Sequence, residues 1–225
     1  MTPRFDLSLL PPAPDFAFEI ALWGGGCRYV AGVDEAGRGA LAGPVAAGVV
    51  VFPNEPGLLP RLAGVRDSKQ MSPSERLIWA GRLKRLALAW AVGFASVDEI
   101  DSLGIVPATR LAACRATRSL GEQPEHLLVD FLELPELPIP QTPLVKGDRR
   151  SLSIAAASIL AKTERDALLC ELERRYPGYG LAQHKGYATQ AHRLALRRLG
   201  PAPIHRRSFG PVLSLSPSAP LPQGG

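Results

Sequence analysis

Apolar residues alternate or cluster in five short stretches that predict the strands of a sheet. The first, "YVAGVD" at 29–34, alternates and contains β-branched residues, as strands do. "PVAAGVVVFP" at 44–53 and "LALAWAVGFASV" at 86–97 contain the next two. The short connection between the first two favours antiparallel pairing. "EHLLVD" at 125–130 and "TPLVKGD" at 142–148 predict two more strands, each with an aspartate at its end.

Helical signals lie between and after these strands. Ser72 is a predicted N-cap, Pro73 occupies the first helical position, and Glu75 completes a capping box. Periodicity, alanine content and terminal glycines or prolines predict further helices at 107–121, 153–176 and 189–200. This mixture of strands and helices predicts an α/β fold.

Composition narrows the class of protein. With 225 residues, 46% hydrophobic and 21% charged, the chain is expected to form one globular domain with at most a small helical appendage. Its three cysteines are isolated in the sequence, which argues against a zinc site and fits a reducing, cytoplasmic environment. The longest apolar run is too short to span a bilayer. We therefore expect a cytoplasmic protein, and nothing in the sequence demands more than a monomer.

Positive charge is concentrated in the second half of the chain. The net charge is +5, and residues 146–207 contain 13 Lys/Arg against 5 Asp/Glu. Such an excess fits a polyanionic partner, while a solvated basic surface explains the charge alone equally well.

Four carboxylates follow predicted strands: Asp34 and Glu35, Asp130, and Asp148. An aspartate after a strand is often only a turn former. If these strands are neighbours, however, the acids converge, and their repulsion must be relieved by protons or cations. Oxygen ligands without cysteine select Mg²⁺ or Mn²⁺. Two such ions about 4 Å apart suit in-line displacement at a phosphodiester.

A family resemblance sharpens this expectation. "GVDEAGRGALAGPV" resembles the signature of ribonuclease HII, and five further blocks follow in the family's order: "RDSKQMSPSER", "LVKGD", "SIAAASILAKTERD", "YPGYGLAQHKGYAT" and "PIHRRSFGPV". Together they span roughly residues 29–213. The resemblance implies a ribonuclease H-like fold: a five-stranded mixed sheet flanked by helices, with a C-terminal helical region. We expect a catalytic domain at 28–180 and a helical substrate-binding region at 181–212. Composition predicts a variable, Pro- and Gly-rich lead-in at 1–27 and a low-complexity, disordered tail at 213–225.

The resemblance also implies roles for individual residues. Eight positions match, as metal-binding carboxylates, as a loop that reads the ribose 2′-hydroxyl, and as a tyrosine that works with that loop. In that order they are Asp34, Glu35, Asp130 and Asp148; Gly37, Arg38 and Gly39; and Tyr187. Lys69 and Lys162 are further candidates, as contacts to phosphate. The implied activity is a two-metal endonuclease, with Mn²⁺ or Mg²⁺, that acts on RNA–DNA hybrids and on duplex DNA containing ribonucleotides. It would cut on the 5′ side of the ribonucleotide and leave 3′-hydroxyl and 5′-phosphate ends, a role in DNA repair and replication.

Some residues depart from the family pattern or also allow a purely structural interpretation. Phe131 stands where the family usually has a glycine after the third metal-binding acid. Lys162 and Asp166 lie four apart on the long helix and could form an ordinary ion pair. His184 is a candidate proton shuttle or a structural residue.

Two other classes of function fit less well. A phosphate-binding loop would need a different glycine spacing than "AGRGALAG" provides. A non-catalytic nucleic-acid-binding module would leave the acids unexplained, because they repel phosphate. The related ribonuclease HIII is expected to be longer, with an extra N-terminal domain.

Overall fold

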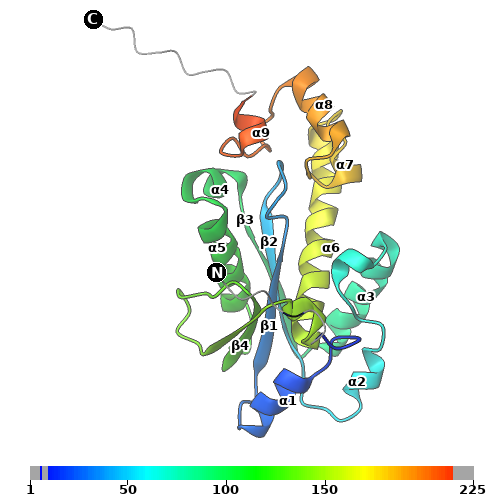
Figure 1. Ribbon diagram of the computed structural model, residues 1–225, viewed down its shortest axis with the longest axis vertical. Helices are drawn as coiled ribbons and strands as arrows, with labels where there is room; N and C mark the ends of the chain where they lie inside the picture. Colours follow the sequence, from blue (N-terminus) through cyan, green and yellow to red (C-terminus); the bar gives the residue numbers. More distant parts are fainter. Residues whose placement is uncertain (1–5, 7–9, 215–225) are drawn as a thin grey trace, which may run out of the picture.

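The computed structural model describes residue 6 and residues 10–214. At its centre is a five-stranded mixed sheet with the order β3-β2-β1-β4-β5 (Figure 1). β2 runs antiparallel to both β1 and β3, whereas β1, β4 and β5 are parallel to one another. The antiparallel pairing predicted for the first two strands is therefore confirmed. The strands are β1 Val30–Ala36, β2 Val45–Val51, β3 Ala89–Ala95, β4 His126–Asp130 and β5 Gln141–Leu144.

Helices cover both faces of the sheet. In Figure 1, α5 and α4 lie on one face, while α6 and α3 lie on the other. Each face has its own buried hydrophobic cluster against the central strands. The helices in the described residues are α1 Ala17–Gly24, α2 Leu58–Arg61, α3 Pro73–Leu86, α4 Val97–Leu103, α5 Ile105–Arg118, α6 Leu152–Arg175, α7 Leu181–His184, α8 Gln190–Leu199 and α9 Gly210–Leu213, with 3-10 helices η2 Ser68–Gln70 and η3 Gly147–Arg149.

The sheet and α6 approach each other very closely. A Cβ atom added at Gly48 of β2 would lie 2.3 Å from the carbonyl oxygen of Ala157, and one at Gly32 of β1 would lie 2.1 Å from the carbonyl carbon of Ser153. These two strand positions therefore require glycine, since any side chain would push α6 off the sheet. This contact fixes α6 relative to the end of β1.

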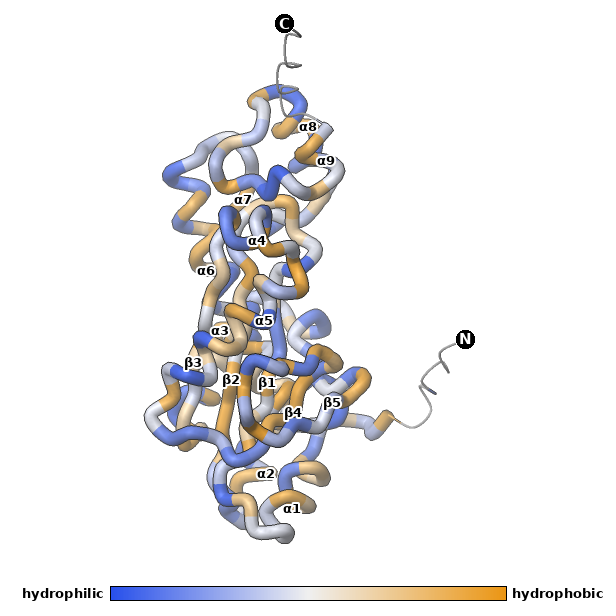
Figure 2. Tube along the Cα trace, turned by 90° about the vertical axis from the view of Figure 1, so that its left-hand side faces the viewer, coloured by the Kyte–Doolittle hydropathy of each residue, from blue (hydrophilic) through white to orange (hydrophobic). Residues whose placement is uncertain are grey.

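The C-terminal helices form a layer of their own at one end of the molecule. Figure 2 shows α7, α8 and α9 beyond the end of the sheet, next to the far end of α6. A third hydrophobic cluster joins this layer to Leu41 and Ala42 in the β1–β2 connection. The segment that follows β1 is thus held between the sheet and the C-terminal layer.

Most predicted elements are present, with two informative differences. The capping box at Ser72 and Glu75 is observed, and α3 begins at Pro73 as predicted. The strand expected to reach Asp148 ends instead at Leu144, and Asp148 lies in η3. α4 was missed, although Ser96 and Glu99 form a second capping box.

The ends of the chain complete this comparison. The predicted lead-in contains α1, and buried Glu19 of α1 accepts hydrogen bonds from the Ser151 hydroxyl (2.6 Å) and the Ser153 amide (3.0 Å). Of the tail predicted to be disordered, 213–225, only the first two residues belong to the described part, where they end α9. The remainder of that prediction lies outside the described residues. Within those residues, no helix is both long and apolar enough to cross a membrane.

Candidate active site

Three carboxylates from separate segments meet at the end of the parallel strands. Asp34 lies on β1, Asp130 ends β4, and Asp148 lies in η3. One oxygen of each lies within 4.8 Å of the other two. Asp34 and Asp148 are almost fully buried, with 5% and 3% of their surfaces exposed. We call these three residues the acidic triad; the convergence expected from the sequence is observed for them.

The strand register explains this convergence. Val33 of β1 pairs with Val129 of parallel β4, so the next residues, Asp34 and Asp130, lie side by side. The amide of Gly147 donates to Oδ1 of Asp130 over 2.8 Å. A Cβ at Gly147 would lie 2.7 Å from Cδ1 of Ile154. Glycine at this position therefore fits the close packing against Ile154, and its amide orients Asp130 beside Asp148.

Burial and mutual repulsion raise the pKa values of the triad. Burial is the main cause for Asp34, followed by repulsion from Glu35 and Asp130, while a hydrogen bond with Ser158 opposes the rise in its pKa. Burial also raises the pKa of Asp130, against the effect of the Gly147 amide, and that of Asp148, with repulsion from Asp130 as the second cause. A cluster of this kind is unfavourable as three free anions, so it is suited to a cation.

Glu35 is not part of the triad in this structure. Its Oε1 lies 3.1 Å from Nη1 of Arg38, in an ion pair. Its amide donates to Oδ1 of Asp34 over 2.7 Å. Glu35 is therefore next to the triad, with its carboxylate held by Arg38, which was itself predicted to contact the substrate.

Lys69 contacts the triad through Asp148. Its Nζ lies 3.7 Å from Oδ2 of Asp148, and three quarters of its side chain is exposed. Burial would lower its pKa, but Asp148 and Asp34 outweigh this effect and raise it. Asp67 caps η2 by accepting from the Lys69 amide over 2.9 Å. This cap positions a fully charged ammonium group beside the acids.

The glycine-bracketed loop after β1 rests on two buried arginines. Nη1 of Arg206 donates to the carbonyl of Arg38 over 2.8 Å. Gly37 has φ 93°, and a Cβ there would lie 1.9 Å from Nε of Arg165. At Gly39, by contrast, a Cβ would meet nothing within 4 Å. Arg165 and Arg206 thus support one side of the loop, while the space at Gly39 is open, so a substrate can approach the loop backbone there.

Arg165 also joins this loop to the segment that carries Tyr187. It donates to the carbonyls of Pro44 (2.8 Å), Ala42 (3.0 Å) and Lys185 (3.0 Å). Its guanidinium lies 5.6 Å from the ring centroid of Tyr187. The sequence analysis missed Arg165, because nothing in "TERD" distinguishes a buried arginine from a surface one. Arg206 likewise lies in a basic segment, "PIHRRSFGPV", whose sequence does not indicate that it is buried.

Lys162 and Asp166 form an ion pair four residues apart on α6, which the sequence analysis gave as the alternative to a phosphate contact by Lys162. Nζ of Lys162 lies 2.8 Å from Oδ1 of Asp166, which also pairs with Arg76 at 3.4 Å. The Lys162 ammonium lies 5.2 Å from the ring centroid of Tyr187. Asp166 therefore holds Lys162 near Tyr187 rather than joining the triad.

His184 belongs to a chain of histidines that supports the same segment. Its Nε2 lies 2.8 Å from the carbonyl oxygen of Tyr179, and its ring stacks on His192 with 4.3 Å between centroids. His192 contacts the Tyr187 carbonyl through Nδ1 (2.9 Å) and Nε2 of His205 through its own Nε2 (3.1 Å). These contacts make His184 part of the packing that positions Tyr187.

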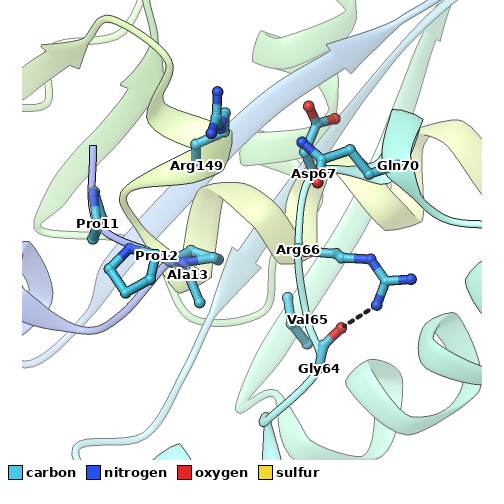
Figure 3. A pocket seen from close by; sticks show the side chains of 10 residues that line it. Pro11, Pro12, Ala13, Gly64, Val65, Arg66, Asp67, Gln70 and Arg149 are labelled. Carbon is cyan, nitrogen blue, oxygen red and sulfur yellow. Dashed lines mark hydrogen bonds between the residues drawn. The ribbon is translucent and has the colours of Figure 1, made fainter. Parts of the chain in front are cut away.

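One cleft of about 220 Å³ unites these features. Nine of the ten predicted site residues line it, and the tenth, Asp148, contacts Lys69 at its wall. A separate hollow of about 170 Å³ lies near Pro11, Arg66 and Arg149 (Figure 3). There, Arg66 turns away to pair with Glu75. The cleft is lined by Asp34, Glu35, Ala36, Gly37, Arg38, Gly39, Ser68, Lys69, Asp130, Lys162 and Tyr187.

Solved structures place this architecture in a known class. The ribonuclease H2 from Pyrococcus horikoshii OT3 is 26% identical, with a TM-score of 0.71 over 83% of this chain and 96% of that one. The RNase HII in the PCNA complex from Archaeoglobus fulgidus has a TM-score of 0.67 and 26% identity over 79% and 92% of the two chains. The fold and the acidic triad define a ribonuclease H-like, divalent-metal-dependent nuclease. The predicted fold class is thus confirmed.

Sequence comparison gives the particular family. The family described as Ribonuclease HII matches residues 31–212. The Ribonuclease HII of Synechococcus sp. (strain JA-3-3Ab) is 55% identical over 90% of each chain. That of Moorella thermoacetica is 54% identical over 86% of this chain and 92% of its own. The chain therefore belongs to the ribonuclease HII family of endonucleases.

Proposed function

We propose that this protein hydrolyses the RNA strand of RNA–DNA hybrids and cuts duplex DNA on the 5′ side of embedded ribonucleotides. The observation that carries the proposal is the single cleft in which the acidic triad adjoins the loop of Gly37, Arg38 and Gly39 and the ring of Tyr187. A hydrolytic centre and a sugar-reading surface are thus side by side. Products with 3′-hydroxyl and 5′-phosphate ends follow from the family's reaction.

The donor set fits a pair of divalent metal ions. Asp34, Asp130 and Asp148 would hold them, with Glu35 released from Arg38 to complete the set. Oxygen ligands alone suit Mg²⁺ or Mn²⁺. When bound, the ions supply a nucleophilic water and stabilise the leaving oxygen of an in-line displacement. Burial, followed by repulsion among the acids, raises the pKa values of the triad, so three free anions are unfavourable there and a cation is favoured.

The remaining residues bind and orient the substrate. Gly37 and Gly39 let the loop backbone approach a ribose, and Arg38 and Tyr187 face the same cleft. A contact to the 2′-hydroxyl there distinguishes RNA from DNA. Lys69 and Lys162 place ammonium groups for the flanking phosphates.

The C-terminal layer extends the binding surface. We infer that residues 181–212, appended to a catalytic domain of 28–180, close over the duplex and contact its backbone without reading sequence. Arg193, Arg197 and Arg198 on α8 supply positive charge for this role. In the cell, the activity serves removal of ribonucleotides from DNA during repair and replication, carried out by a cytoplasmic monomer.

A duplex with one ribonucleotide tests the proposal directly. The strand bearing the ribonucleotide is labelled at its 5′ end and incubated with enzyme and Mg²⁺, Mn²⁺ or EDTA. We expect one cut, directly 5′ of the ribonucleotide, only with a divalent ion. An all-DNA duplex is the matched control. Cleavage in EDTA, cleavage of the all-DNA duplex, or no cleavage with either metal would refute the proposed function.

A further inference from the structure

Phe131, the residue directly after Asp130, combines two unfavourable features. Its φ is 67°, in the left-handed region that favours glycine. Its side chain is 70% exposed, more than Leu77 at 67% and Leu213 at 60%. A left-handed conformation costs roughly 1–2 kcal/mol for a residue with a Cβ, and an exposed aromatic ring gains little from folding. Neither feature helps this protein to fold, so both call for another reason.

The surrounding turn holds this conformation in place. The amide of Phe131 donates to the carbonyl of Val129 over 2.9 Å, and that of Leu132 donates to the carbonyl of Asp130 over 2.8 Å. Leu132 points inward, where it lines a small cavity together with Asp34 and Asp130. This turn therefore holds the left-handed backbone of Phe131, whose ring is exposed to solvent. Strain of this kind clusters at functional sites.

Because Phe131 directly follows Asp130, its ring lies near the acidic triad. Adjacent Cα atoms are about 3.8 Å apart, so the ring stays on the order of 10 Å from the triad. A duplex advances about 3.4 Å per nucleotide along each strand. The distance from the triad to the Phe131 ring therefore corresponds to about three nucleotides of a duplex whose scissile bond lies at the triad.

We propose that Phe131 contacts the substrate, with its ring packed against the sugar and base of a nucleotide close to the cleaved bond. The inference rests on the proposed function. Apolar side chains insert between base steps from the minor groove and partly unstack them, and an aromatic ring placed there can stack on the exposed base face, as rings do on single strands. The ring adds affinity for the duplex, while the 2′-hydroxyl is read elsewhere in the cleft.

Substitutions at this position separate binding from folding. We expect Phe131→Gly to raise Tm, because it relieves the left-handed strain, and yet to raise KM for the single-ribonucleotide duplex about 5- to 100-fold. Phe131→Ala should raise KM equally without the gain in Tm. Phe131→Trp should keep KM near that of the wild type. Leu77→Ala, which truncates an equally exposed side chain on α3, is the control and should leave KM unchanged.

The outcomes distinguish this inference from the proposed function. If the wild type cuts but KM is unchanged in both Phe131→Gly and Phe131→Ala, the ring does not contact substrate and the inference is wrong. An equal loss of kcat in the Ala and Trp variants would likewise overturn it, because it would mean that the turn merely positions Asp130. If the wild type itself fails to cut, the proposed function fails first. A duplex with 2-aminopurine placed at successive positions then identifies the stacked nucleotide, as the position whose fluorescence differs between wild type and Phe131→Ala.

Discussion

Replacing Asp34 by asparagine removes one charge from the acidic triad while keeping its shape. The amide oxygen can still accept the hydrogen bond that Oδ1 now receives from the Glu35 amide. The change should relieve repulsion with two neighbours whose oxygens lie within 4.8 Å. At an effective dielectric constant of about 20, each pair of full charges at that distance repels by about 3.5 kcal/mol. In the wild type, protonation of the triad acids, whose pKa values are raised, already relieves part of this repulsion.

The variant should therefore be more stable and less active. Without divalent ions near pH 8, we expect a gain of about 1–3 kcal/mol in the free energy of unfolding, or roughly 2–10 °C in Tm for a chain of this size. A divalent ion at 100 times its Kd stabilises the wild type by about 2.7 kcal/mol, and the variant should gain much less. Cleavage should fall by more than about 100-fold, the upper range for changing only an outer partner of a metal ligand.

Thermal unfolding in EDTA and in Mn²⁺, followed by cleavage of the single-ribonucleotide duplex, measures both effects. Asp98→Asn is the matched control, since it makes the same chemical change at an exposed position on α4. It should alter neither the response to metal nor the rate. The electrostatic reasoning fails if Asp34→Asn is less stable than the wild type in EDTA. The site assignment fails if the variant cuts at near wild-type rate in Mn²⁺.

Three further changes test the loops around the triad. Tyr187→Ala should reduce kcat/KM on the single-ribonucleotide duplex by more than on an RNA–DNA hybrid; equal losses on both substrates would remove Tyr187 from recognition. Gly37→Ala should lower stability in urea by about 1–3 kcal/mol, because its Cβ would lie 1.9 Å from Nε of Arg165; unchanged stability would contradict the predicted clash. Burial lowers the pKa of His205 from 6.5 to about 4, so between these values the unfolded state binds a proton that the folded state does not. Wild-type stability due to His205 is therefore present above about pH 6.5 and is lost as pH falls toward 4, by about 2 kcal/mol at pH 5. The stability difference between wild type and His205→Gln should shrink by that amount from pH 7.5 to 5, and a constant difference would disprove the assignment.

Capping signals in the sequence predict where helices begin, and the alternation of apolar residues predicts the strands of the sheet. The capping box at Ser72 predicts the first residue of α3 correctly. The same sequence pattern at Ser96 marks the start of α4, but it follows a predicted strand directly and is therefore easily assigned to that strand. Asp148 was placed on a strand because "TPLVKGD" continues an extended pattern. Lys146 adopts a left-handed conformation with φ 57° and ends the extended pattern, which nothing in the local sequence indicates.

The site was less predictable where it depends on burial. Asp34 and Asp130 follow their strands directly, so parallel pairing alone brings them together. Arg165 and Arg206 look like surface residues in a basic segment, yet both are fully buried and hold carbonyl groups of the loop after β1. Phe131 is the opposite case, an apolar residue that is exposed. It replaces the glycine usual in the family, yet its backbone keeps the conformation that glycine favours.

The long helix α6 sets the spacing between the two halves of the site. Ser158 lies near Asp34, and Arg165, two turns further along, holds the loop and the segment of Tyr187. A helix turns by about 100° per residue. Deleting one residue between these positions would therefore rotate Arg165 away from its carbonyl partners while leaving the triad intact. The number of α6 residues between Ser158 and Arg165 thus sets the distance and angle between the acidic triad and the loop that would contact the ribose.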